Sequence, residues 1–461
     1  MLETHLFKER QTVKLGLIKT VQDLFPGETL KTAYSIKDGV FCRLDKSALS
    51  EREVRKIGVC LREWVKNDEP IEFLCRKDGY YHYRMGETVV KVLYPADTHA
   101  SRAEPFSVLP FFPGFIVDFA ASGEEKNLLL PERLSSAYDK TQKWLSNIGI
   151  ELVPDVNAYI ESGRSLELIS IAEALQEKEI SDIADTILKE RRSVRVVLIT
   201  GPSSSGKTTF AQRLSAQLRV NGLRPIPLSL DNYFLNRNMT PRRKDGSYDF
   251  ESLHALDLKL LQRQVTELIG GETVETPLFD FVTGTRMEKT RPLSMGPSEI
   301  LLIEGIHALN PELLPAIGRY NLFKIYLGSL FELNVDLMNR VPTTEVRLLR
   351  RMVRSVRYRG TSPEETIRQW DAVRAGERKS IFRFAEESDV VFNSSLLYEM
   401  HALRPFAEDS LKQIPDDSPF RDTRDRLMNL LDFFQNMDCS KIPFNSILRE
   451  FIGGSIYFDE E

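Results

Sequence analysis

The amino-acid sequence predicts an α/β fold in which helices cover both faces of a mostly parallel sheet. A smaller α+β domain is expected before the sheet and a helical tail after it. Three observations support this prediction. Short β-branched runs alternate with helical segments after Val194, a glycine-rich turn follows the first run, and the residues before about 120 lack this alternation. Alternating strands and helices are typical of a parallel sheet.

The composition is that of an ordinary globular protein. Of 461 residues, 42% are hydrophobic and 28% charged, so the chain can bury a large core and is not disordered. The net charge of −5 argues against a strongly basic nucleic-acid binder. The four cysteines form no CxxC pair and no zinc-type spacing. The charged N-terminal segment is no signal peptide, and no apolar run approaches about 18 residues. We therefore expect a cytoplasmic protein without a membrane partner.

The composition and periodicity of the sequence predict four zones. We expect an α+β domain over residues 1–122, a helical connector over 123–190, the parallel-sheet domain over 191–400 and a helical tail over 401–461. The connector carries apolar residues at the three- and four-residue spacing of helices. In the tail, the apolar segment PFNSILREFIGGSIYF (443–458) suits docking onto another domain or subunit, so a homo-oligomer stays open.

Five apolar runs are predicted as strands of the parallel sheet. They lie at residues 194–200, 224–231, 298–305, 322–327 and 389–393. The first, VRVVLIT, is short and rich in β-branched residues, which is typical of a buried strand. Because helical segments separate most of these runs, we expect the carboxyl ends of the strands to share one edge of the sheet.

A phosphate-binding loop is the strongest signal in the sequence. Residues 201–208, GPSSSGKT, match the pattern GxxxxGK(S/T) and lie between the first strand and a helix. Glycines let backbone N–H groups turn toward phosphate oxygens, and the helix N-terminus favours negative charge. Lys207 can reach the β- and γ-phosphates, and the Thr208 hydroxyl can bind Mg²⁺. The predicted nucleotide contacts are Gly201, Ser203, Ser204, Ser205, Gly206, Lys207, Thr208 and Thr209.

Two acidic residues follow other strands of the predicted sheet. Glu304 ends the run ILLIEG, where a carboxylate at the sheet edge can hold Mg²⁺ directly or through water. Asp231 ends the second run, in SLDNYF. A carboxylate there can accept a proton from an attacking hydroxyl group or help to hold the metal. The spacing fits an Asx turn at Asp231 equally well.

A basic segment covers residues 338–359. Its helical spacing places four guanidinium groups on one face, those of Arg347, Arg350, Arg351 and Arg354. Such a face can clamp a transferring phosphoryl group or bind RNA phosphate. A charge run is usually a solvated face, but the phosphate loop favours phosphate binding here. The NKxD motif of GTPases and the HRDxxxxN motif of protein kinases are absent.

Taken in order, these motifs resemble the uridine kinase/phosphoribulokinase family of P-loop kinases. The matching stretches cover about residues 194–395 and are GPSSSGKTT, SLDNYF, DGSYDFESLHALD, TPLFDFVTGTR, ILLIEGIHAL and RLLRRMVRSVRYRG. The resemblance implies a P-loop NTPase-type sheet and a Mg²⁺- and ATP-dependent kinase for a small-molecule substrate, a nucleoside. It makes Asp231 the base for the sugar 5′-hydroxyl and Glu304 a magnesium-site acid, and it places the four arginines in a mobile lid over the phosphates.

The substrate side departs from the family pattern at two places. Uridine kinases carry an Asp of F-D-H-P on the ribose hydroxyls, where this sequence reads FESL, and Glu251 can still accept from a diol. The uracil-reading His of Y-D-F-x-x-H-S-R is replaced by Gly284, which has no side chain to bond a base. Phe279 and Phe281 offer aromatic surface for base stacking or for core packing. Arg286 completes the predicted substrate-binding set, and base specificity stays open.

A second, weaker resemblance lies in the N-terminal zone. LFPGETLKTAYSIKDGVFCRLDKSALSEREVRKIGVCLREWV (24–65) is similar to the second N-terminal, editing-type domain of threonyl-tRNA synthetases. That domain carries an HxxxH motif on the helix before its F/W-P, and Leu15 and Lys19 occupy those places here. We therefore expect that metal- or His-dependent editing does not survive.

The first hypothesis is thus an ATP-dependent kinase that acts on a nucleoside 5′-hydroxyl. Within the kinase class, the alternative is a phosphoribulokinase- or pantothenate kinase-like substrate. A different class is an RNA-linked regulatory protein that uses ATP as a switch, which predicts salt-sensitive tRNA binding and little phosphorylation. A third interpretation makes the N-terminal domain and the tail a scaffold for a dimer.

Overall fold

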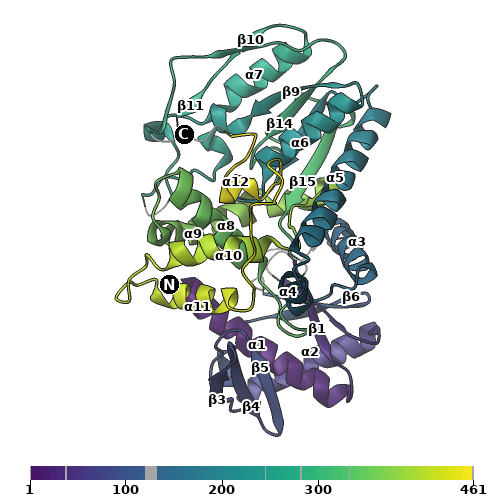
Figure 1. Cartoon of the computed structure of the whole chain (residues 1–461), viewed down its shortest axis with the longest axis vertical. Coiled ribbons are helices and arrows are strands. Elements are labelled where there is room, and N and C mark those ends of the chain that lie inside the picture. Colours follow the sequence, from purple (N-terminus) through teal and green to yellow (C-terminus); the bar gives the residue numbers. More distant parts are fainter. Residues whose placement is uncertain are drawn as a thin grey trace.

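A five-stranded parallel sheet forms the centre of the larger part of the molecule (Figure 1). The computed structural model describes residues 2–36, 39–119, 132–243, 246–280, 283–331 and 333–458. Across the sheet the strands lie in the order β9 (Arg224–Ser229), β14 (Glu299–Glu304), β8 (Val196–Thr200), β15 (Leu322–Gly328) and β16 (Val390–Asn393). The five predicted strands are confirmed, each to within about two residues at its ends.

The strand order determines where a ligand can bind. β8 is central, and the chain leaves it through α6 (Lys207–Val220) to reach β9 at one edge of the sheet. β15 and β16 are then added on the other side of β8. All neighbouring strands are parallel, so their carboxyl ends meet at one edge. Ligands of such sheets bind at the carboxyl edge where the strand order reverses, which here is the end of β8.

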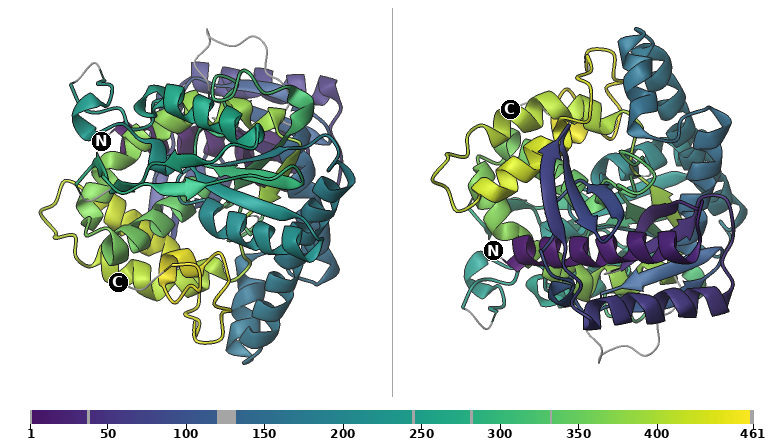
Figure 2. Two further views of the ribbon diagram at one scale, coloured as in Figure 1. Left: turned by 90° about the horizontal axis from the view of Figure 1, so that it is seen from above. Right: turned by 90° about the horizontal axis from the view of Figure 1, so that it is seen from below.

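Both faces of the sheet are buried (Figure 2). Val196 and Leu198 pack in one apolar cluster, whereas Val197 and Ile199 pack in another. Successive side chains of a strand point to opposite faces, which explains why all four residues from Val196 to Ile199 are apolar. The helices that pack with the sheet are α5 (Ser165–Lys189), α6, α7 (Leu258–Ile269), α8 (Thr343–Tyr358), α9 (Pro363–Ser380) and α10 (Glu399–Leu411).

The N-terminal part, at the lower end of Figure 1, is a smaller α+β unit with two antiparallel sheets. One sheet has the order β1 (Leu30–Ile36), β2 (Gly39–Leu44), β7 (Gly114–Asp118) and β6 (Ser107–Phe111). The other consists of β3 (Glu72–Lys77), β4 (Tyr80–Met85) and β5 (Thr88–Val92). They pack with α1 (Leu2–Leu24) and α2 (Glu51–Lys66). A capping box between Ser50 and Glu53 starts α2.

Between the two parts in the chain lie the helices α3 (Glu132–Asn147), α4 (Val153–Glu161) and α5. The beginning of the predicted connector, residues 123–131, lies outside the described residues. The remaining strands form two short hairpin-like pairs, β10 (Val274–Thr276) with β13 (Arg291–Leu293) and β11 (Phe279–Asp280) with β12 (Thr285–Arg286). In the described part of the chain, no helix combines the length and the apolar character that crossing a bilayer requires.

The tail contains α10, α11 (Arg421–Leu431) and the short α12 (Arg449–Ile452). The apolar segment 443–458 docks within this chain. Its Ile447, Leu448, Phe451 and Ile452 are buried in the cluster that also contains α8 (Figure 1). This segment therefore packs on the parallel-sheet part, one of the two kinds of site that its apolar character predicts.

A buried ion pair joins α8 to α10. The Arg350 guanidinium donates from Nε and Nη2 to the two carboxylate oxygens of Glu399, at 2.7 and 2.5 Å. The two side chains are 1% and 0% exposed. Removal of one partner from such a pair leaves an uncompensated charge inside the protein, which is far more costly than the loss of a surface pair.

Glu399→Gln is therefore expected to lower the free energy of unfolding by about 3–5 kcal/mol, because Arg350 would keep its charge without a counter-ion. Urea denaturation followed by circular dichroism measures this change. The matched control is Glu365→Gln, which breaks the exposed pair with Arg368 and should cost no more than about 1 kcal/mol. Equal losses in the two variants would contradict a special role for the buried pair.

Candidate functional site

The loop between β8 and α6 has the backbone of a phosphate-binding loop. Ser204 and Gly206 have positive φ angles of 61° and 83°, and Gly206 caps the N-terminus of α6. A Cβ atom at Gly201 would lie 2.4 Å from the carbonyl oxygen of Leu327, so only glycine fits there. The predicted strand–loop–helix arrangement is confirmed, with the loop at the carboxyl edge of the central strand.

Polar atoms without partners line the loop. Ser205 Oγ, Arg351 Nε and Arg354 Nε are buried and have no hydrogen-bond partner among the described residues. Arg351 donates to the Ser203 hydroxyl at 2.7 Å, and Arg354 donates to the Ser204 hydroxyl at 3.3 Å. Buried donors are rarely left unsatisfied, and guanidinium groups suit phosphate oxygens. These residues fit the phosphates of ATP.

The other two arginines of α8 hold the loop by its carbonyl groups. Arg347 donates to the carbonyl oxygen of Ser203 at 3.1 Å, and Arg350 donates to that of Ser204 at 3.2 Å. Arg347 also forms a buried ion pair with Glu377 of α9. The arginine face predicted from spacing is therefore divided, with one pair of side chains on the backbone of the loop and the other pair on its hydroxyl groups.

Lys207 lies among three carboxylates. Burial lowers the pKa of Lys207, and the charges of Glu304, Asp231 and Glu450 oppose that shift. In this structure its ammonium group donates to the carbonyl oxygen of Pro202 at 3.2 Å. The loop lysine and the two acidic residues predicted at the sheet edge are thus brought together.

Glu304 is a buried carboxylate at the end of β14. The Ser229 hydroxyl donates to it at 2.5 Å. Burial, followed by the charge of Asp231, raises the pKa of Glu304 to about 7. Glu304 and Asp231 are neighbouring carboxylates and suit a hard cation such as Mg²⁺, and the half-buried Thr208 directly follows Lys207 in the chain. No group of three or more His, Cys, Asp or Glu residues with metal-site geometry exists among the described residues. A bound Mg²⁺ would therefore need water and phosphate oxygens as further ligands.

Asp231 does not end a strand, because β9 stops at Ser229 and Asp231 lies in a short 3-10 helix, η2 (Leu230–Tyr233). It remains half-buried and close to Lys207. Arg286 holds the backbone of the residues that follow Asp231 in the chain. Its guanidinium donates to the carbonyl oxygens of Tyr233 and Phe234 and to the Asp257 carboxylate, at 3.0 to 3.1 Å. Each of the three guanidinium nitrogens of Arg286 therefore has a protein acceptor.

Glu251 lies where α9 approaches the loop. A Cβ atom at Gly376 of α9 would lie 2.3 Å from the Glu251 Cβ atom, so glycine permits the close approach. Burial, followed by the charge of Glu377, raises the pKa of Glu251 to about 7, whereas Arg351 and Lys207 oppose that shift. These partners place the predicted substrate-binding carboxylate on the side of the phosphate loop.

The β11–β12 pair carries the remaining predicted substrate residues. The Phe279 ring lies 5.8 Å from the Phe234 ring, between centroids. At Gly284, whose φ angle is 70°, a Cβ atom would lie 2.6 Å from Nε of Arg237. The Arg237 guanidinium therefore occupies the space beside Gly284. Phe281 lies outside the described residues.

Sequence reasoning missed the carboxylates Glu377 and Glu450. Glu377 accepts from the Ser203 N–H at 2.9 Å. Glu450, in the segment 443–458, accepts from the Thr209 hydroxyl at 3.0 Å and from Arg354 at 2.9 Å. The apolar character of that segment was its one unusual feature, and no spacing rule connects it to a loop some 240 residues earlier.

Residues 196–397 match the phosphoribulokinase/uridine kinase family. This match leaves out the N-terminal part, so the resemblance of residues 24–65 to a synthetase domain stays a prediction. Among solved structures, a "possible uridine kinase" from Bacillus stearothermophilus is 23% identical, with 47% of this chain and 100% of that chain covered at a TM-score of 0.31.

Two uridine kinases are similar to the chain in sequence. That of Ureaplasma parvum is 25% identical over 210 residues, which cover 46% of this chain and 91% of the relative. That of Mycoplasma genitalium is 31% identical over 175 residues, which cover 38% of this chain and 73% of the relative. With a phosphate-binding loop, two edge carboxylates and these relatives, the chain belongs to the phosphoribulokinase/uridine kinase family of kinases.

Proposed function

We propose that the protein transfers the γ-phosphoryl group of ATP to the 5′-hydroxyl group of a nucleoside. The observation that supports this most is the convergence of Lys207, Asp231 and Glu304 at the carboxyl edge of the central strands. Phosphoryl transfer depends on positioning and on charge stabilisation rather than on covalent chemistry, and these are what the site offers.

The donor side of the site carries positive charge toward the phosphates. Lys207, Arg351 and Arg354 would neutralise the charge that spreads over the transferring group. Mg²⁺ bound by Thr208 and Glu304 would supply further neutralisation of the phosphate oxygens. Arg347 and Arg350 are positioning residues in this proposal, because they act on the loop through its carbonyl groups.

The acceptor side of the site carries the general base and the groups that would contact the sugar. Asp231 would accept the proton of the attacking hydroxyl group. Glu251 would accept hydrogen bonds from the ribose diol, and the ring of Phe279 would lie near the nucleobase of the substrate. Arg286 supports this side indirectly, because it fixes the residues after Asp231.

One observation favours a second candidate, a kinase for another small hydroxyl substrate. Arg237 lies against Gly284, where the uridine kinases that the sequence resembles carry a base-reading histidine. A guanidinium group donates hydrogen bonds and accepts none, so it would select different acceptors on the substrate.

A panel of acceptors distinguishes the two candidates. ADP release is measured with Mg-ATP and uridine, cytidine, adenosine, guanosine, inosine, pantothenate, ribulose 5-phosphate or no acceptor. We expect one nucleoside to stimulate ADP release at least about tenfold over the rate without acceptor. Stimulation by a non-nucleoside alone would support the second candidate and contradict the first.

Asp231→Asn is expected to lower kcat by about 10²–10⁴-fold, because the amide cannot take the proton of the hydroxyl group. Binding of ATP should change little, because Asp231 contributes no contact to the phosphate loop in the proposal. Initial rates and ATP titration calorimetry measure the two effects. Asp409→Asn, at a side chain that is 80% exposed, is the matched control and should keep wild-type kcat. Full activity of Asp231→Asn would exclude Asp231 as the base.

The KM for the acceptor is expected to fall several-fold as the pH rises from about 6 to about 8. Because Glu251 has a pKa raised to about 7, its ionised form, the better acceptor for a diol, becomes dominant over this range. Steady-state kinetics across the range measure KM. In Glu251→Gln this pH dependence should disappear and KM should be high throughout. An unchanged KM profile in that variant would show that Glu251 does not contact the acceptor.

A further inference from the structure

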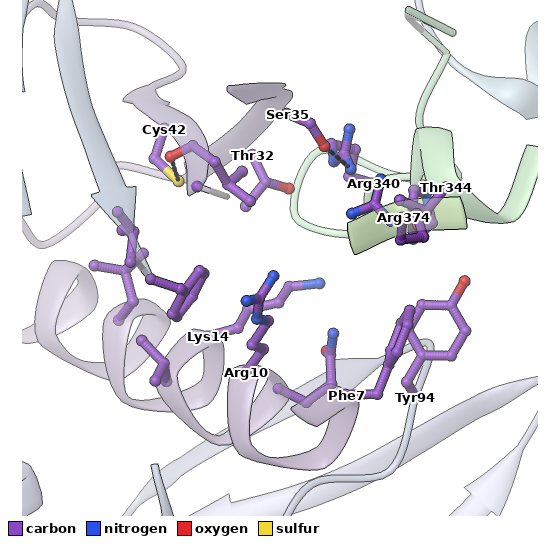
Figure 3. A pocket seen from close by; sticks show the side chains of 18 of the residues that line it. Phe7, Arg10, Lys14, Thr32, Ser35, Cys42, Tyr94, Arg340, Thr344 and Arg374 are labelled. Carbon is purple, nitrogen blue, oxygen red and sulfur yellow. Dashed lines mark hydrogen bonds between the residues drawn. The ribbon is translucent and has the colours of Figure 1, made fainter. Parts of the chain in front are cut away.

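A cavity of about 190 Å³ lies between the N-terminal part and the parallel-sheet part of the molecule. Side chains of α1 line one side of it, and residues around the start of α8 and along α9 line the other (Figure 3). No residue of the phosphate loop, 201–208, is among its lining residues. The cavity has room for a small molecule, since a single water needs only about 10–15 Å³ on this measure.

The lining of this cavity is strongly cationic. Its described lining residues include five basic side chains and no acidic one, and the basic ones are Arg10, Lys14, Arg340, Arg374 and Arg378. Figure 3 shows Arg10 and Lys14 on one side of the cavity, with Arg340 and Arg374 on the opposite side.

The partners of the two cations at the centre are neutral. Lys14 donates to the side-chain oxygen of Asn339 at 2.8 Å, and Arg340 donates to the Ser35 hydroxyl at 2.6 Å. Burial lowers the pKa of Lys14 to about 8 and that of Arg340 to about 10. By contrast, Arg10, whose side chain is 30% exposed, has a carboxylate partner, Glu104, at 2.5 Å. Asp336 opposes the lowering of the Lys14 pKa, and no carboxylate does so for Arg340, so the described residues balance the two central cations only in part.

Several buried polar atoms of the lining lack partners. The Tyr94 hydroxyl, on a side chain that is 2% exposed, has no hydrogen-bond partner among the described residues. The same holds for Arg340 Nη1 and for Gln11 Oε1. A buried polar atom without a hydrogen-bond partner costs free energy. A polar ligand that forms hydrogen bonds with these atoms would remove that cost and bind more tightly.

The cavity also has an apolar side. Phe7 and Tyr94 meet edge to face with centroids 5.3 Å apart, and Val13, Leu17 and Val117 contribute aliphatic surface. The cavity thus combines cationic side chains with aromatic rings, which fits a ligand that carries both an anionic head and an organic group.

We propose that this cavity binds a small organic phosphate monoester, with its phosphate between Lys14 and Arg340 and its organic group against Phe7 and Tyr94. A phosphate dianion matches two cations that the described residues balance only in part, and it offers enough acceptor oxygens for the Nη1 group of Arg340 and for the Tyr94 hydroxyl. A monocarboxylate offers one charge and fewer acceptors. The site is separate from the kinase centre and does not rest on the proposed function.

The cavity is nevertheless connected to the kinase centre through α9. Arg374 and Arg378 of this helix line the cavity, and Glu377 of the same helix accepts from the backbone N–H of Ser203 in the phosphate loop. A ligand in the cavity therefore contacts an element that also contacts the nucleotide site.

Titration calorimetry with phenyl phosphate tests the site on the full chain. A saturating non-hydrolysable ATP analogue with Mg²⁺ is present throughout, so that the phosphate loop is filled. We expect phenyl phosphate to bind with a Kd below about 1 mM, benzoate to bind at least about tenfold more weakly, and phenol not to bind. Lys14→Met and Arg340→Met, each tested separately, should weaken phenyl phosphate binding at least about tenfold. Arg55→Met, at an exposed arginine of α2, is the matched control and should bind as the wild type does.

Three results would overturn the proposal. One is no heat of binding with phenyl phosphate up to about 10 mM. Another is wild-type affinity in whichever of the two cavity variants keeps a cooperative thermal transition. Binding of benzoate as tight as that of phenyl phosphate would exclude the phosphate assignment and would indicate a general anion site.

Discussion

The shape of the phosphate loop depends on α8, which donates hydrogen bonds to the backbone carbonyl groups on the protein-facing side of the loop. When a loop turns its N–H groups toward a ligand, its carbonyl groups point away, and here they point into the protein. Arg347 and Arg350 meet those carbonyl oxygens, and Glu377 and Glu399 balance the buried charges. Without the arginines, the carbonyl oxygens of the loop would lack hydrogen-bond donors. Without the glutamates, the arginines would be buried cations without counter-ions.

This constraint explains the order of elements around the site. The carboxylates come from α9 and α10, so both helices must pack against α8 for the loop to keep its shape. The remaining arginines of α8, Arg351 and Arg354, are then left on the side of the loop serines. The position of each arginine along the face of α8 thus decides whether it contacts the carbonyl groups or the hydroxyl groups of the loop.

Most of the parallel sheet and the loop could be predicted from the sequence, because both depend on local patterns. The strands are short apolar runs and the loop has a fixed spacing, so neighbouring residues carry the information. The role of α8 was only partly visible, because spacing places arginines on one face but does not show which of them lie on carbonyl groups. Glu377 and Glu450 were out of reach, since their importance comes from contacts across the fold. The cationic cavity was equally hidden, because Lys14 and Arg340 are separated by more than 300 residues and meet through docking of the two parts.

The position of the segment 443–458 affects which fragments of the chain can keep the phosphate loop covered. Ile447 lies against Gly206, where a Cβ atom would come within 2.5 Å of its methyl group, and Glu450 binds Thr209 and Arg354. A fragment trimmed to the family-matching residues 196–397 would lose this segment and expose apolar surface beside the phosphate loop. The part of the chain that packs around the phosphate loop therefore extends well beyond the region that sequence similarity marks out.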